Sequence, residues 1–200
     1  MEQTKYFFLT FIAIAMTVTM ARSPPSSTTT TTTTQTYTNF VKTSCNATTY
    51  PTVCLTSLLP YATAVKSNPL KLVKQALSAT LKSASTTRST VSKLAKRKNL
   101  SKDDAAVLKD CIGEIKDAMD EITDSLKAIS SLGSSTVNKK FAISNAQTWA
   151  SAAITDEYTC IDEFSDMEVS PAVKKKVRSS IEKIARQSSN ALYLINHLDI

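Results

Sequence analysis

The strongest constraint in the sequence is a run of apolar residues that repeats at alternating intervals of three and four positions. It consists of Ala105, Leu108, Ile112, Ile115, Met119, Ile122, Leu126 and Ile129. This spacing places the side chains on one stripe of an α-helix, and the stripe needs partner helices to bury it. Ser101 with Asp104 three positions later resembles a capping box, and Gly133 is suited to a C-cap. A helix over residues 101–132 is therefore expected.

Two more stripes of the same spacing lie on either side of the first. Each begins at a proline that follows an N-cap residue, at Asn68-Pro69 and at Ser170-Pro171. The earlier stripe consists of Leu70, Val73, Leu77, Thr80, Ala84, Thr87, Val91 and Leu94. The later stripe consists of Val177, Ile181, Ile184, Ser188, Ala191, Ile195 and Leu198. Both predict long amphipathic helices.

A fourth helix is expected over residues 136–166. Its core side is mostly small, with Ala142, Ala146, Ala150 and Ala153, and its large members are Trp149 and Phe164. Four long amphipathic segments joined by short breaks predict an all-α fold, an antiparallel up-and-down four-helix bundle. Only two glycines in 200 residues argue against a sheet-rich fold with many tight turns. A smaller unit, residues 39–63, precedes the bundle, and Thr49-Tyr50-Pro51 indicates a helix start within it.

The first 21 residues are interpreted as a secretory signal peptide rather than a membrane anchor. Lys5 precedes an apolar run at 6–16, which is short for a bilayer span, and Thr19 and Ala21 fit a small-residue cleavage site. No later segment is apolar enough to span a membrane. The mature protein is therefore expected to be soluble and secreted to the extracellular space.

Residues 22–38 are predicted to form a disordered leader. They include seven consecutive threonines, which bury nothing and cannot offset their own ordering entropy. The folded domain is accordingly expected over residues 39–200. It contains two N-glycosylation sequons, at Asn46 and Asn99, which fit secretion.

Charge is divided unevenly along the chain. Residues 101–168 hold 14 acidic and 6 basic residues, whereas the rest holds 3 acidic and 18 basic ones. A uniformly basic nucleic-acid binder is not built this way, and no aromatic residues interleave the basic runs, so no nucleic-acid partner is expected. The basic stretches at 93–98 and 174–178 are interpreted as solvated helix faces.

Four cysteines in a secreted chain indicate two disulfides, with three possible pairings. Cys111 lies 22 residues before Gly133, and Cys160 lies 27 residues after it. Two antiparallel helices folded at this turn bring the two cysteines level, close enough for a disulfide. The geometry therefore predicts Cys111–Cys160 and leaves Cys45–Cys54 as a local pair.

The residues that enzyme chemistry requires are missing from the sequence. His197 is the only histidine, and nothing places it beside a nucleophile. There is no metal-ligand cluster and no glycine-rich phosphate loop, so neither a cofactor nor a metal is expected. The paired acids Asp103-Asp104 and Glu163 with Asp166 are interpreted as solvent-facing charges. The chain is predicted not to be an enzyme.

Three stretches together form a specific signature that covers about residues 39–198. They are FVKTSCNATTYPTVCLTSL at 40–58, LSKDDAAVLKDCIGEI at 100–115 and NAQTWASAAITDEYTCIDEF at 145–164. They resemble the plant pectin methylesterase inhibitor and invertase inhibitor family. The resemblance implies a four-helix bundle with an N-terminal helical hairpin and the same two disulfides. It also implies stoichiometric, non-catalytic inhibition of a carbohydrate-active enzyme in the apoplast, the space of the plant cell wall.

In the esterase-inhibiting branch, the resemblance implies that the bundle covers the pectin-binding cleft of the enzyme. Polar residues near the fourth cysteine would make the contacts. Carried over by position, the target-binding residues are Asp117, Thr159 and Asp162. An acid is also expected two positions after the third cysteine, but this chain has Gly113 there, beside Glu114. That departure removes one expected contact.

Two details favour the esterase branch over the invertase branch. LSKDDAAVLKDC, and KTSC followed by Asn-Ala-Thr, look more like esterase inhibitors, and the short Pro-Lys-Phe segment of invertase inhibitors is absent. The expected partner is therefore a pectin methylesterase in a 1:1 complex, and because the chain ends at Ile200 a free-standing inhibitor is expected. Inhibition of cell-wall or vacuolar invertase is the alternative. A second alternative is a wall interaction protein without an enzyme target, whose polar face serves only solubility.

Overall fold

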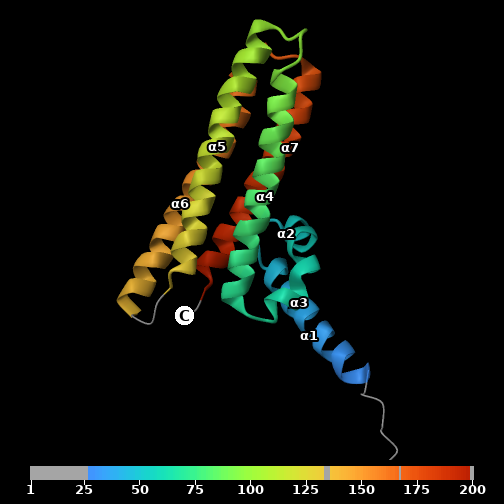
Figure 1. The fold of residues 1–200 in the computed structure, drawn as a ribbon, viewed down its shortest axis with the longest axis vertical. Coiled ribbons are helices and arrows are strands. Elements are labelled where there is room, and N and C mark those ends of the chain that lie inside the picture. The colour runs from blue at the N-terminus through green and yellow to red at the C-terminus, as the bar shows by residue number, and fades with distance from the viewer. Residues whose placement is uncertain (1–26, 133–135, 167, 199–200) are drawn as a thin grey trace, which may run out of the picture.

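The computed structural model describes residues 27–132, 136–166 and 168–198. The four expected long helices are α4 (Pro69–Ala95), α5 (Lys102–Ser130), α6 (Thr136–Asp166) and α7 (Pro171–Asn196). Consecutive helices run antiparallel, with α5 beside α6 and α4 beside α7 (Figure 1). The predicted all-α four-helix bundle is thus confirmed. The predicted signal peptide, residues 1–21, lies outside the described residues.

The smaller N-terminal unit forms α1 (Ser27–Asn46), α2 (Pro51–Leu58), the 3-10 turn η1 (Leu59–Tyr61) and α3 (Ala62–Val65). It packs at one end of the bundle, against α4 and α7 (Figure 1). Cys45 and Cys54 are bonded, which joins α1 to α2 with their Cα atoms 5.3 Å apart. The Tyr50 N–H donates to Asn190 Oδ1 of α7, and Asn190 Nδ2 donates to the Tyr50 carbonyl oxygen, both at 2.9 Å. These two bonds fix the hairpin to the bundle.

The structure differs from the expected disordered leader at residues 27–38, which belong to α1. The Thr36 hydroxyl donates to the Thr32 carbonyl oxygen at 3.0 Å. This bond satisfies the hydroxyl group within the helix, whose later turns are anchored by the fully buried Val41 and Cys45. Composition alone did not indicate this because a threonine tract has no apolar stripe. The division of the chain at residue 39 stays a prediction.

Asn68 and Ser101 cap their helices as predicted, whereas Ser170 lies at the N-cap position of α7 without a capping hydrogen bond from its side chain. Asn68 accepts a hydrogen bond from the Lys71 N–H, and Ser101 accepts one from the Asp104 N–H, each at 2.9 Å. Asp104 does not complete a capping box. Its carboxylate is buried and accepts from the Ser170 N–H at 2.9 Å, directly before α7. The interpretation of Asp104 as a solvent-facing charge was therefore wrong.

The apolar stripe of α7 is buried throughout, and that of α4 is buried from Val73 to Leu94. In α5 every second member of the predicted stripe is buried as predicted, and each of the other members is replaced in the core by the residue one position before it. The buried members are Asp104, Leu108, Cys111, Ile115, Ala118, Ile122, Ser125 and Ile129, with Val107 beside them. Small side chains allow α6 to come close on this side, and the Ser125 hydroxyl donates to the Ala146 carbonyl oxygen at 2.9 Å. The expected end at Gly133 lies outside the described residues, and α5 ends at Ser130.

The prediction of Trp149 as a core member of α6 was wrong. Its side chain is 40% exposed, whereas Phe164, the other large member, is fully buried. The buried stripe of α6 consists of Ala146, Ala150, Ala153, Glu157, Cys160 and Phe164. These positions alternate by four and three, and Trp149 lies beside the stripe rather than within it.

Candidate binding surface

The α5–α6 pair is held together by the second disulfide. Cys111 and Cys160 are bonded and fully buried, with their Cα atoms 4.7 Å apart. The buried Ala146, Ala150 and Ala153 of α6 are small, which lets α5 approach closely along this part of the helix. The two helices lie side by side (Figure 1), and their covalent link restricts movement between them, so we call this pair the platform.

All three predicted target-binding residues lie exposed on this platform. Asp117 is on α5, where Lys116 Nζ lies 3.3 Å from its Oδ1. Thr159 and Asp162 are three positions apart on α6, a spacing that places them on one face of the helix. The Thr159 hydroxyl donates to the Thr155 carbonyl oxygen at 3.0 Å. The structure thus presents the three side chains to solvent on neighbouring helices, and the carboxylate of Asp117 is close enough to Asp156 of α6 to raise the pKa of Asp156.

Carboxylates from both helices gather along the junction of α5 and α6. We call this set the acidic seam; it comprises Asp110, Glu114, Asp117, Glu121, Asp156 and Glu163. Burial first, and the negative charge of neighbouring carboxylates next, raise the pKa values of Glu114 and Glu163. The interpretation of Glu163 as an ordinary solvent-facing charge was incomplete, because its carboxylate is part of this seam.

Glu121 and Asp156 are the most closely coupled members of the acidic seam. Burial, then the charge of Asp156 and a hydrogen bond to it, raise the pKa of Glu121 to about 7. Burial also raises the pKa of Asp156, while the hydrogen bond to Glu121 acts in the opposite direction. A hydrogen bond between two carboxyl groups requires a proton on one of them. In weakly acidic solution the pair therefore holds one proton and carries one negative charge rather than two.

Glu157 is fully buried where α6 faces α7. Its Oε1 accepts a hydrogen bond from the Ser188 hydroxyl at 2.8 Å, and its Oε2 has no partner among the described residues. Burial raises its pKa to about 8, against the smaller opposing effect of the Ser188 hydrogen bond. Glu157 and Ser188 lie between two apolar clusters, one containing Ala153 and Ala191 and the other containing Cys160. The burial of Glu157 could have been predicted from the sequence, because Glu157 continues the spacing of four and three residues that the buried alanines of α6 follow.

Sequence reasoning also missed two exposed aromatic residues on α6. Trp149 is 40% exposed and Tyr158 is 42% exposed. Trp149 lies seven positions before Asp156, which places it on the same side of the helix, next to the acidic seam. Tyr158 lies toward the N-terminal hairpin, and burial and a hydrogen bond to Tyr50 raise its pKa. Exposed aromatic side chains of this kind are common anchors in protein–protein interfaces.

The remaining residues named in the sequence analysis, Gly113, His197, Asn46 and Asn99, are all exposed to solvent. Gly113 is exposed in the middle of α5, and a Cβ atom there would have no neighbour within 4 Å. His197 is exposed at the end of α7, and its ring stacks on Tyr193 with centroids 4.0 Å apart. The predicted glycosylation sites Asn46 and Asn99 are both exposed. Within the described ranges, no group of three or more metal-binding side chains could hold a metal ion.

The family model described as plant invertase/pectin methylesterase inhibitor matches residues 39–194. The chain belongs to this family. Its members are non-enzymatic inhibitor proteins, in agreement with the missing catalytic residues. The predicted family is thereby confirmed.

Similar proteins cover most of the chain. Pectinesterase inhibitor 4 of Arabidopsis thaliana is 36% identical over 194 residues, which cover 94% of this chain and 98% of that protein. Pectinesterase inhibitor 11 of the same plant is 39% identical over 160 residues, 79% of each chain. The crystal structure of mutant form A of a pectin methylesterase inhibitor from Arabidopsis has a TM-score of 0.62 at 19% identity. It aligns with 80% of this chain and 97% of that one, which shows a shared fold.

Proposed function

We propose that this protein inhibits pectin methylesterase and binds it through the outer surface of α5 and α6. The proposal is supported by the family and by the relatives described as pectinesterase inhibitors. The single structural observation that carries it is the exposure of Asp117, Thr159 and Asp162 on the disulfide-joined helix pair.

The mode of action follows from the stiffness of that pair. A surface fixed by packing and a disulfide loses little conformational freedom on binding, so more of the contact free energy appears as affinity. Trp149 supplies an aromatic anchor, and the acidic seam favours a partner whose facing surface is basic. The inhibitor would form a 1:1 complex that covers the pectin-binding cleft of the enzyme without being turned over.

The same proposal places the protein outside the cell, in the plant cell wall. All four cysteines are in disulfides, as expected in an oxidising compartment. The exposed Asn46 and Asn99 are available for glycosylation during secretion. Within the described ranges, no helix is long and apolar enough to cross a bilayer.

Invertase is the second candidate target, because the matching family includes inhibitors of both enzymes. The deciding experiment is a titration of purified pectin methylesterase and purified invertase with the chain without its predicted signal peptide, residues 22–200. We expect esterase activity to fall linearly until the inhibitor is equimolar and then to stay constant, while invertase activity is unchanged. Loss of invertase activity alone would reverse the assignment. If neither enzyme were inhibited, the protein would be a wall interaction protein without either target.

A further inference from the structure

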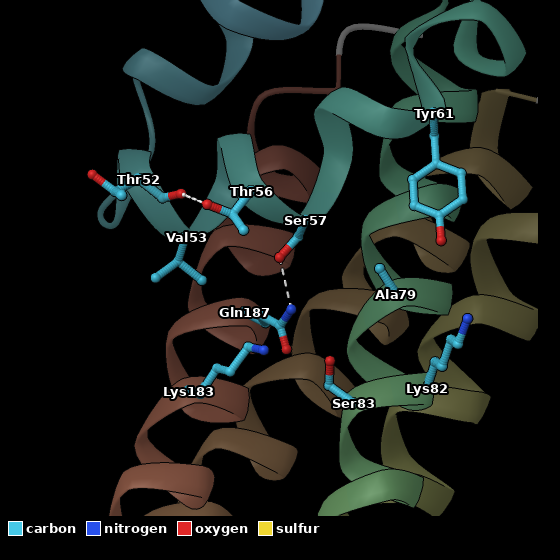
Figure 2. A pocket seen from close by; sticks show the side chains of 10 residues that line it. All are labelled: Thr52, Val53, Thr56, Ser57, Tyr61, Ala79, Lys82, Ser83, Lys183 and Gln187. Atoms are coloured by element: carbon cyan, nitrogen blue, oxygen red, sulfur yellow. Dashed lines mark hydrogen bonds between the residues drawn. The ribbon is translucent and has the colours of Figure 1, made fainter.

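An open hollow of about 340 Å³ lies between the N-terminal hairpin and the α4 and α7 helices (Figure 2). This volume is within the range of small-ligand sites. Its lining includes Ser57, Tyr61, Lys82, Ser83, Lys183 and Gln187. Figure 2 shows the two lysines on opposite sides of the hollow, with Tyr61 near the hairpin end. The lining therefore combines hydroxyl groups, two ammonium groups and one aromatic ring.

A second hollow of similar volume, about 340 Å³, continues from the first along α4 and α7. The two share Lys82, Ser83 and Lys183, and the second extends past Thr86 and Thr90. We call the two together the hydroxyl groove. Its length along the bundle suits a chain-like ligand better than a compact one.

Gln187 provides an independent indication of a ligand. Its side chain is only 6% exposed, and its Nε2 donates to the Ser57 hydroxyl at 2.7 Å. Its carbonyl oxygen Oε1 has no hydrogen-bond partner among the described residues. Figure 2 shows this oxygen on the side of the hollow where Lys183 and Ser83 lie. A ligand hydroxyl group that reached this acceptor, which is itself buried in the free protein, would satisfy it.

The electrostatics of the groove favour an anion. α4 contains four lysines and one arginine but no acidic residue. The single acid of α7, Glu182, is already paired with Arg178 at 2.9 Å and with Arg186 at 3.5 Å. In the part of the chain that the structure describes, no ion pair involves Lys82 or Lys183. Two unneutralised ammonium groups thus remain available across the groove.

We propose that the hydroxyl groove binds an acidic oligosaccharide, a chain of uronic acid residues. Its carboxylates would bind Lys82 and Lys183, and its hydroxyl groups would bond to Ser83 and to the free oxygen of Gln187. A simple anion such as phosphate would use the ammonium groups but leave Gln187 unsatisfied. An acidic peptide would bring carboxylates with few hydroxyl groups. This site is separate from the α5–α6 surface and does not depend on the proposed inhibitor function.

The binding test is isothermal titration calorimetry of the chain without its predicted signal peptide, residues 22–200, with three probes. These are hexagalacturonate, a neutral maltohexaose of the same length, and inorganic phosphate. We expect hexagalacturonate to bind at least tenfold more tightly than either other probe, with an affinity that falls as salt is added. Undetectable hexagalacturonate binding would overturn the proposal. So would equal binding of maltohexaose, or equal binding of phosphate, which would indicate a simple anion site.

A matched pair of variants locates the site. Lys82→Gln with Lys183→Gln should weaken hexagalacturonate binding at least tenfold. The control, Lys98→Gln with Lys175→Gln, removes the same charge from exposed positions that lie outside both the groove and the α5–α6 surface, and it should bind like the parent. Equal weakening by both pairs would show non-specific attraction and overturn the assignment. Both pairs should inhibit pectin methylesterase like the parent, so failure of this proposal and failure of the inhibitor function give different results.

Discussion

The α5–α6 pair and the α4–α7 pair belong to one bundle, yet they present opposite surfaces. In the first, alanines and a disulfide bring the helices close, and acids line the junction. In the second, hydroxyl-bearing side chains and lysines line hollows between the helices. The same topology therefore supplies a closed acidic platform on one side and an open basic groove on the other.

The comparison shows that the size of the buried side chains and the charge of the exposed side chains differ independently between the two helix pairs. Small buried residues close the α5–α6 junction, and no comparable covalent link joins α4 to α7 in the described residues. The acidic part of the sequence forms the α5–α6 face, and the basic parts form the α4–α7 face. A partner with a basic surface and a ligand with negative charge can then be recognised by one small protein without competing.

The largest expected effect comes from opening the closed pair. Cys111→Ser with Cys160→Ser removes a link that spans 49 residues, and should lower the free energy of unfolding by about 2–4 kcal/mol. Denaturant titration of the oxidised protein measures this change. The matched control is Cys45→Ser with Cys54→Ser, which opens a loop of only 9 residues and should cost less. An equal or larger loss in the control would show that the hairpin, rather than the α5–α6 pair, limits stability.

The buried carboxyl between α6 and α7 should make stability depend on pH. Because the folded-state pKa of Glu157 is about 8 and its ordinary value is 4.5, the folded state holds the proton more tightly than the unfolded state. The free energy of unfolding should therefore be highest below pH 4.5 and fall as pH rises to about 8. Each pKa unit corresponds to about 1.4 kcal/mol of stability. Water that enters beside the ionised Glu157 would reduce the cost of its charge, so we expect the free energy of unfolding to fall by on the order of 2–3 kcal/mol between pH 5 and 9.

Glu157→Gln tests this assignment, since the amide keeps the shape of the side chain and cannot ionise. Denaturant titrations at several pH values should show most of the fall removed. A smaller dependence of the same sign should remain from Glu121 and Asp156, whose pKa values are also raised. The exposed Glu168→Gln is the control and should keep the full dependence. An unchanged pH profile for Glu157→Gln would show that this carboxyl is not the group responsible.

The platform should be sensitive to bulk at its centre. Thr159→Arg should weaken inhibition of pectin methylesterase more than tenfold, about 1.4 kcal/mol, because a long cation would stand between the surfaces. Helix content by circular dichroism should be unchanged, since Thr159 is exposed. Ser179→Arg places the same side chain at an exposed position of α7 and should inhibit like the parent. Equal inhibition by Thr159→Arg and the parent would leave solubility as the role of this face.

The smallest effect concerns Gly113. Alanine should raise the free energy of unfolding by about 1 kcal/mol, because glycine is unfavourable inside a helix and the new Cβ has no neighbour within 4 Å. Gly113→Asp restores the acid that the family resemblance leads one to expect and should strengthen esterase inhibition. Denaturant titration and inhibition assays measure the two effects. Weaker inhibition by Gly113→Asp would show that this position faces an acidic or crowded part of the enzyme.

The sequence was sufficient for the four long helices, the caps at Asn68 and Ser101, and the disulfide pairing, because each depends on residues at fixed spacings along the chain. The sequence did not predict the burial of side chains that depends on contacts between distant parts of the chain. Asp104 became buried because Ser170, far along the chain, supplied a donor. Trp149 became exposed because alanines filled the core beside it. The hydroxyl groove could not be inferred, because its residues come from three separate helices.

The most direct test of the two-face account is oxidative footprinting of side chains in the free inhibitor and in its complex with pectin methylesterase. Trp149 reports on the acidic platform, and Tyr61 reports on the hydroxyl groove. We predict that the complex protects Trp149 from oxidation at least several-fold and leaves Tyr61 as reactive as in the free protein. Protection of Tyr61 with an unprotected Trp149 would contradict the account, because the enzyme would then be bound by the basic face.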